Sequence, residues 1–218
     1  DHFRDHICVR HVAGIRNFSQ SALLGNDPLN MKILPVPLTR DADAFTIAHE
    51  PIAAIDLMER AASCCLGWLG EHIPKDRTLK VFCGSGNNGG DGFAIARLLF
   101  LQGYTVETYL VSPVDRMSDD CLINFQRLGP CKDAGMPACV VLHDSNSLPV
   151  VNQDDIVIDA IFGNGLTRHP AGREAAVIRH INESGALVIS IDIPSGLFCD
   201  ASVKNLPAEG IMSADYTL

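Results

Sequence analysis

The stretch from Leu79 to Phe100 constrains the fold of this chain most, because a buried strand, a glycine-rich turn and a helix follow one another there without interruption. An apolar run ends at Cys83, and five glycines follow within nine residues. Phe93 to Leu101 is apolar nearly all round, as expected of a covered helix. Because glycine costs chain entropy, we expect the turn to need positive φ angles or the close approach of a ligand. The free N–H groups and positive dipole end of the helix start predict an anion site.

The same turn contains two overlapping motifs of unequal specificity. Gly84-x-Gly86-x-x-Gly89 matches the dinucleotide-binding fingerprint, and Glu107 lies where a ribose-binding acid is expected. That match alone is weak. Asn87-Asn88-Gly89-Gly90-Asp91-Gly92 is more specific, because it puts two amides and a carboxylate where the fingerprint keeps only backbone. Asp91 by itself fits a helix N-cap equally well, whereas the whole hexapeptide indicates binding.

Length, charge and hydropathy exclude several classes of protein. The 218 residues, 47% of them hydrophobic, suit one α/β domain with a full core. The chain has 17 basic and 26 acidic residues and no long basic cluster, so we expect no nucleic-acid partner. No apolar run approaches the roughly 18 residues of a membrane span, and no secretory signal is visible. We therefore expect a soluble protein without a membrane partner.

The cysteines and histidines show no metal-binding spacing. None of the eight cysteines forms a Cys-x-x-Cys pair, and several lie in apolar runs, which favours reduced thiols in a cytoplasmic compartment. The eight histidines lack His-Glu-x-x-His spacing, so zinc or iron is not expected.

Both ends of the chain differ from its middle. Residues 1–30 mix charges and histidines and precede Met31, so we interpret them as an extension of uncertain origin and 31–218 as the domain. Ser213 to Leu218 reads as the start of a strand that stops before any turn. We therefore expect the domain to be truncated at its C-terminus, where an unfinished strand would favour self-association.

Helix-like and strand-like stretches alternate through the domain. The expected helices are 51–71, 93–101, 119–128 and 171–183, and the expected strands are 80–83, 104–111, 138–142, 155–163 and 186–192. This alternation predicts an α/β fold with a parallel sheet and helices on both faces. Ligands of such sheets bind at the carboxyl ends of the strands, where three polar loops then meet: 84–91, 159–169 and 192–196.

These loops bring together amide, hydroxyl and carboxylate oxygens. The candidates are Asn88, Asp91, Asp159, Arg168, Asp192 and Ser195. Such a mixture suits a hard cation, and the small number of negative ligands favours one of low charge. Asp159 or Asp192 alone could simply hydrogen-bond the next turn, but we expect at least one of the two to act in the site.

Four segments resemble the NAD(P)H-hydrate epimerase family, in the same order along the chain. They are Leu57-Met-Glu-Arg-Ala61, Gly84-Ser-Gly-Asn-Asn-Gly-Gly-Asp-Gly92, Asp159-Ala-Ile-Phe-Gly-Asn-Gly-Leu166 and Ser190-Ile-Asp-Ile-Pro-Ser-Gly196. The resemblance implies a Rossmann-like three-layer αβα sandwich with a mostly parallel sheet. It also implies an isomerase that interconverts the R and S forms of NADHX and NADPHX, which are nicotinamide cofactors damaged by hydration.

The resemblance also assigns roles to individual residues. The hydrated cofactor would be bound by Asn87, Asn88, Gly89, Gly90, Asp91, Gly163, Asn164, Gly165, Leu166, Thr167, Arg168, His169 and Asp192. A potassium ion would be held by Asn88, Asp159 and Ser195. We expect Asp192 to be the acid/base, with Asp159 as the alternative if the ion leaves it free.

Two other functions stay open at this point. An NAD-dependent dehydrogenase is supported by the fingerprint spacing, although no catalytic His, Lys or Tyr is evident; a non-catalytic nucleotide-binding or protein-interaction module would keep the same loops. For an epimerase, the resemblance implies a dinucleotide substrate and a fused or separate ADP/ATP-dependent NAD(P)H-hydrate dehydratase, and it leaves a homodimer open.

Overall fold

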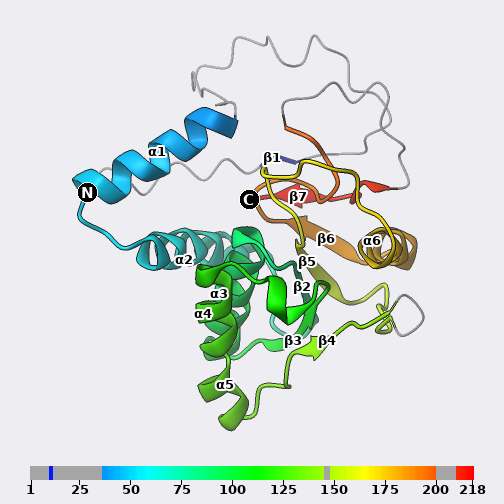
Figure 1. The fold of residues 1–218 in the computed structure, drawn as a ribbon. Coiled ribbons are helices and arrows are strands. Elements are labelled where there is room, and N and C mark those ends of the chain that lie inside the picture. The colour runs from blue at the N-terminus through cyan, green and yellow to red at the C-terminus, as the bar shows by residue number, and fades with distance from the viewer. Residues whose placement is uncertain (1–9, 12–35, 145–147, 200–209) are drawn as a thin grey trace.

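The computed structural model describes residues 10–11, 36–144, 148–199 and 210–218. Their central feature is a sheet with strand order β1-β7-β6-β5-β2-β3-β4. Figure 1 shows α2 to α5 on one side of this sheet and α6 on the other. The expected three-layer αβα sandwich is therefore confirmed. Most of residues 1–30, including Cys8, lie outside the described part of the chain.

The sheet is parallel except at one edge. Its parallel strands are β2 (Thr78–Cys83), β3 (Thr105–Leu110), β4 (Val140–Val141), β5 (Ile156–Ala160), β6 (Leu187–Ser190) and β7 (Tyr216–Thr217). The short strand β1 (Arg10–His11) pairs antiparallel with β7. Cys83 is opposite both Leu110 and Ala160, so β2, β3 and β5 end at the same edge. The predicted meeting of loops at that edge follows from this register.

Four of the described helices match expected ones, whereas the helices 36–49 and 129–133 were not among those expected. The described α-helices are α1 (Val36–His49), α2 (Ala54–His72), α3 (Asn87–Leu101), α4 (Asp119–Gln126), α5 (Gly129–Asp133) and α6 (Arg173–Ser184). The helix expected from residue 51 begins at Ala54, because Pro51 and its neighbours connect α1 to α2. Helix α3 begins six residues before Phe93, inside the glycine run.

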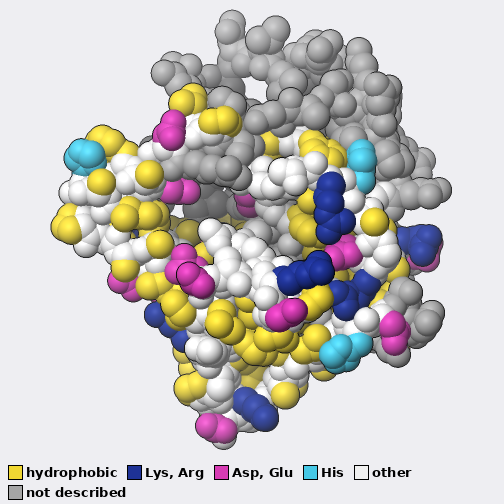
Figure 2. All heavy atoms as spheres, viewed as in Figure 1, with side chains coloured by type: hydrophobic (Ala, Val, Ile, Leu, Met, Phe, Trp, Pro, Cys, Tyr) yellow, Lys and Arg dark blue, Asp and Glu magenta, His cyan; other side chains and the backbone are white. Residues whose placement is uncertain are grey.

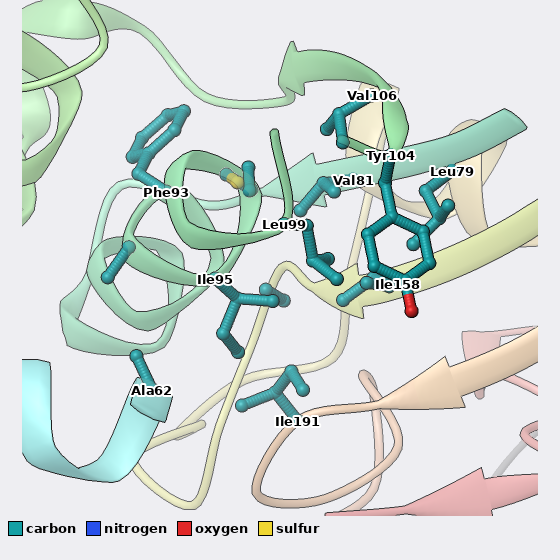
Figure 3. Packing of buried hydrophobic residues seen from close by; sticks show 14 of the residues in the cluster. Ala62, Leu79, Val81, Phe93, Ile95, Leu99, Tyr104, Val106, Ile158 and Ile191 are labelled. Carbon is teal, nitrogen blue, oxygen red and sulfur yellow. The ribbon is translucent and has the colours of Figure 1, made fainter. Parts of the chain in front are cut away.

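Two hydrophobic layers hold the sandwich together. On one face, Leu79 and Val81 of β2 pack with Phe93, Ile95 and Leu99 of α3, and all five are fully buried (Figure 3). The other face packs against α6 through Phe82, Val157, Val177, Ile178 and Ile181. Burial on both faces explains why these strands read as continuous apolar runs. It also holds β2 and α3 rigidly on either side of the glycine-rich turn.

The cysteines in the described ranges are all free, and Cys83, Cys121 and Cys131 are buried among apolar side chains. Those ranges contain no group of three or more His, Cys, Asp or Glu side chains that could hold a metal ion. No helix in the described part of the chain is long and apolar enough to cross a membrane.

Candidate active site

The glycine-rich turn leads directly into α3. The helix begins at Asn87 with Gly86 as its N-cap, and Asp91 lies one turn inside it. The N-cap interpretation of Asp91 is therefore wrong. The first N–H groups of α3 have no partner within the helix. The expected anion-binding helix start therefore lies at Asn87 rather than after Gly92.

Close approach of backbone to backbone, and not positive φ, explains the turn glycines. Positive φ values are found at other glycines among the described residues, such as Gly185 and Gly196, but at none of the five in the turn. A Cβ on Gly89 would lie 2.0 Å from the Gly84 carbonyl oxygen, and one on Gly84 would lie 2.0 Å from the Ile161 carbonyl oxygen. The turn is thus packed against itself and against the loop after β5.

A cavity of about 620 Å³ opens at this edge of the sheet. Most of the expected cofactor-binding residues line it: Asn87, Asn88, Asp91, Gly163, Asn164, Gly165, Leu166, Thr167, Arg168 and Asp192. The lining also includes Ser85, Gly86, Ile161 and Phe162 from the predicted loops, and Thr39 and Asp43, which the sequence did not single out for the site. Figure 2 shows the hollow between α1 and the body of the molecule, with acidic side chains at its edge.

Three of the expected binding residues are not in this lining. Gly89 and Gly90 are buried within α3, where they allow close packing. His169 instead packs edge-on against Phe198, with ring centroids 4.9 Å apart. For these three residues the structure offers packing roles.

Asp192 is positioned by an unusual backbone conformation. Its φ is +68°, in the left-handed region that Asp adopts more readily than most residues. Its Oδ2 accepts a 2.6 Å hydrogen bond from the Asn164 N–H, which ties it to the loop after β5. Partial loss of water raises the pKa of Asp192; the Asn164 N–H opposes this shift, and the charge of Asp43 adds to it. The carboxyl group thus faces the cavity in a form suited to carrying a proton.

Asp91 is a second carboxyl group with a changed proton affinity. Burial, together with the negative charges of Asp192, Asp43 and Asp120, raises the pKa of Asp91 to about 7. Such a value lies close to neutral pH, where a group can both give and accept a proton. Asp91 therefore combines the expected binding position with an acid/base capacity that the sequence did not indicate.

Asp159 is fully buried and does not line the cavity. Its Oδ1 accepts hydrogen bonds from the Ser195 hydroxyl (2.6 Å) and the Ile161 N–H (3.3 Å). Its Oδ2 accepts from the Ser190 hydroxyl (2.7 Å) and the Ser195 N–H (2.9 Å). Burial raises the pKa of Asp159, and these hydrogen bonds oppose the shift. With four hydrogen bonds on its two oxygens, Asp159 joins the ends of β5 and β6.

Asn88, unlike Asp159, has a side chain without hydrogen bonds in the described structure. Its side-chain oxygen and nitrogen are both buried and have no hydrogen-bond partner in the described structure, although the residue lines the cavity. Leaving a buried amide unpaired costs free energy, so such a group in a cavity points to a missing ligand. An amide oxygen of this kind fits either a hard cation or a donor group of a substrate.

Glu107 cannot be the ribose-binding acid of a dehydrogenase. It lies within β3, not after it, where it is hydrogen-bonded to Lys80 of β2 and to the Tyr109 hydroxyl. It does not line the cavity. The fingerprint spacing therefore recurs here without the acid that gives it its meaning in NAD-dependent dehydrogenases.

A parallel αβα sandwich with a glycine-rich turn and a polar cavity at the carboxyl ends of its strands places this chain in the Rossmann-like class of α/β enzymes. Residues 54–218 match the family model described as YjeF-related protein N-terminus. The chain belongs to this family.

Curated relatives have the name that the motifs suggested. A protein from Rhodobacter capsulatus named NAD(P)H-hydrate epimerase is 34% identical over 74% of this chain and 76% of its own length. A bifunctional NAD(P)H-hydrate repair enzyme from Thermofilum pendens is 36% identical over 74% of this chain, but that match spans only 30% of the relative. The solved yeast protein YNL200c shares the fold, with a TM-score of 0.68 and 21% identity over 84% of this chain and 78% of its own.

Proposed function

We propose that this chain is an isomerase that epimerises the hydrated cofactors NADHX and NADPHX. The observation that carries the proposal is the single cavity that unites the loop after β2, the loop after β5 and Asp192. Those are the segments through which the chain resembles its epimerase relatives. The cavity volume, about 620 Å³, is within the range of small-molecule and cofactor sites.

The proposed binding mode divides the cofactor between two kinds of group. The guanidinium of Arg168, the one basic residue in the cavity lining, would hold the anionic phosphates. Asn87, Asn88, Asp91 and the loop 163–168 would hold the rest of the dinucleotide. Glycines of that loop let its backbone approach the ligand closely.

The proposed chemistry passes through a cation. The lone pair of the ring nitrogen expels the C6 hydroxyl, whose departing oxygen takes a proton from the Asp192 carboxyl group and leaves as water. Water then adds to either face of the resulting iminium and returns a proton to Asp192. The face that water attacks decides whether the configuration at C6 is inverted or retained. Asp192 takes this role before Asp159, since Asp159 is fully buried and hydrogen-bonded on both oxygens.

A potassium ion remains part of the proposal, with Asn88 as the residue that fits it best. Its amide oxygen is buried and has no hydrogen-bond partner in the described structure, so it is available to coordinate a cation. Asp159 would supply a neutralising charge and Ser195 a hydroxyl oxygen, although both are already hydrogen-bonded to each other. When bound, the ion would fix the Asn88 amide and add positive charge near the anionic substrate.

We further propose that the epimerase acts with an ADP/ATP-dependent dehydratase that consumes one epimer, either fused to it or separate. A cytoplasmic location, which the cysteine pattern favours, and a homodimer, which rests on the resemblance alone, are also proposals.

Incubation of the protein with an NADHX mixture enriched in one epimer tests the function. We expect the R to S ratio to relax to equilibrium faster with the protein than without it, with no net change in the amount of NADHX. NADH oxidation coupled to a carbonyl substrate would indicate the dehydrogenase instead. Binding of NADHX with an unchanged epimer ratio would indicate the non-catalytic module.

A further inference from the structure

Helix α1 supplies one wall of the cavity. Thr39 and Asp43 are four residues apart, which places them on one face of α1, and both line the cavity. The other helices pack in the layer beside the sheet, whereas α1 lies apart from that layer (Figure 1). Most of its residues are exposed, including Phe45 at 62%. The Asp43 side chain thus reaches the cavity from a helix that belongs to none of the motifs singled out in the sequence.

The carboxylates of the cavity are clustered. Asp43, Asp91 and Asp192 come from three separate elements, and all three line the cavity, whose lining includes one basic residue, Arg168. Burial raises the pKa of both Asp91 and Asp192, and the negative charge of Asp43 adds to the shift of each. We call the part of the lining formed by these three side chains the acidic end of the cavity.

An acidic end is poorly suited to phosphates and well suited to a cation. A dinucleotide has its negative charge at the pyrophosphate, so like-charge repulsion keeps that part away from Asp43, Asp91 and Asp192. In the proposed reaction the nicotinamide ring becomes positively charged when the C6 hydroxyl leaves. Groups arranged before the reaction to face a developing charge stabilise the transition state.

We propose that the acidic end holds the nicotinamide ring, and that Asp43 of α1 is a catalytic residue whose negative charge stabilises the cationic ring. This assignment rests on the proposed epimerase function. Asp192 is occupied with proton transfer and with the Asn164 N–H, and Asp91 is buried enough to hold a proton near neutral pH. Burial raises the pKa of Asp43 as well, but Asp43 is an exposed residue, and water favours its ionised form. It is thus the group best placed to remain charged throughout the reaction.

Binding of NAD⁺ and NADH, two stable cofactors of similar shape, tests whether the charge of the nicotinamide ring matters to the site. NAD⁺ has a positively charged nicotinamide ring like the proposed intermediate, whereas the ring of NADH is neutral. We expect the wild-type protein to bind NAD⁺ more tightly than NADH, measured by calorimetry at constant ionic strength. Asp43→Asn should reduce the NAD⁺ to NADH affinity ratio about tenfold and lower kcat for NADHX by a similar factor, with little change in KM. Asp43→Glu should restore most of both.

Asp41→Asn is the matched control, because Asp41 is exposed on the same helix and does not line the cavity. It should leave the affinity ratio and kcat unchanged. Equal affinity of the wild type for NAD⁺ and NADH, or an Asp43→Asn variant with the wild-type ratio and kcat, would overturn the role of Asp43. A wild-type protein that does not epimerise NADHX would instead overturn the proposed function, while the affinity ratio would still show whether Asp43 faces the ring.

Discussion

Asp192 is positioned by its backbone as much as by its side chain. Its left-handed φ of +68° turns the carboxyl group toward the loop after β5, and its N–H donates to the Leu218 carbonyl oxygen over 2.8 Å. Strained or rare backbone conformations cluster at functional sites because the surrounding structure must maintain them. Asparagine adopts this conformation as readily as aspartate, so the proton can be removed without changing the shape.

Asp192→Asn should therefore lower epimerisation about 100-fold or more while the fold is retained. The Asn side-chain oxygen can still accept the Asn164 N–H, so circular dichroism should match that of the wild type and the melting temperature should be no lower. Turnover is measured as the rate of epimer relaxation of NADHX. A variant with near-normal turnover would remove Asp192 from the acid/base role and leave Asp91 as the next candidate.

Asp91 should make the protein less stable as pH rises. Its pKa is about 7 in the folded protein against an ordinary value of 3.8, so between these values the unfolded chain releases a proton that the folded chain retains. Stability is then lost as pH rises through this window, and the loss is complete above about 7. The Asp91→Asn variant has no ionisable proton at this position, so it should not lose stability in this way.

Thermal melts at several pH values test this expectation. The melting temperature of Asp91→Asn should exceed that of the wild type by about 5 °C at pH 8, a difference that shrinks to nothing near pH 4. Asp119→Asn, an exposed change at the start of α4, is the control. A constant difference across the pH range would mean that Asp91 ionises normally.

At the scale of elements, the glycine-rich turn works through packing. The sequence correctly indicated a strand, a turn and a covered helix between Leu79 and Phe100, because apolar periodicity and glycine content are local properties. It misplaced the helix start, because glycine disfavours helix unless tertiary contacts override that preference. Here Gly89 contacts the Gly84 backbone and Gly90 lies against Met58, so only residues without a side chain let α3 extend back to Asn87.

Gly89→Ala and Gly86→Ala should differ sharply. A Cβ at residue 89 would lie 2.0 Å from a backbone oxygen, which cannot move aside as a side chain can, whereas a Cβ at residue 86 meets nothing within 4 Å. We expect Gly89→Ala to lower the free energy of unfolding by about 2 kcal/mol or more and Gly86→Ala by less than about 1 kcal/mol, measured by urea denaturation. Equal stability of the two variants would show that the turn relaxes freely.

At the scale of the whole molecule, the parallel register explains why so much of the site was predictable. Once β2, β5 and β6 are parallel neighbours, their following loops must meet at one edge, and Asn88, Asp91 and Asp192 meet there. The burial of Asp159 was not predictable, because nothing in the sequence says whether a carboxylate at a strand end faces a cavity or the next loop. Asp43 was missed for a related reason, since only the folded chain brings α1 to the cavity.

The potassium proposal makes a prediction for the molecule as a whole. An ion bound only by the folded state stabilises it by mass action, so the melting temperature should be about 3–6 °C higher when potassium exceeds its dissociation constant tenfold. The reference is tetramethylammonium chloride at equal ionic strength, because this bulky cation cannot enter such a site.

The Asn88→Ala variant should abolish the difference in melting temperature between the two salts. This change removes an amide that forms no hydrogen bond in the described structure. Asn87→Ala, which loses only the 2.8 Å hydrogen bond from the Ser118 hydroxyl, should retain it. Equal melting in the two salts would mean that the unpartnered Asn88 amide awaits the substrate and not an ion.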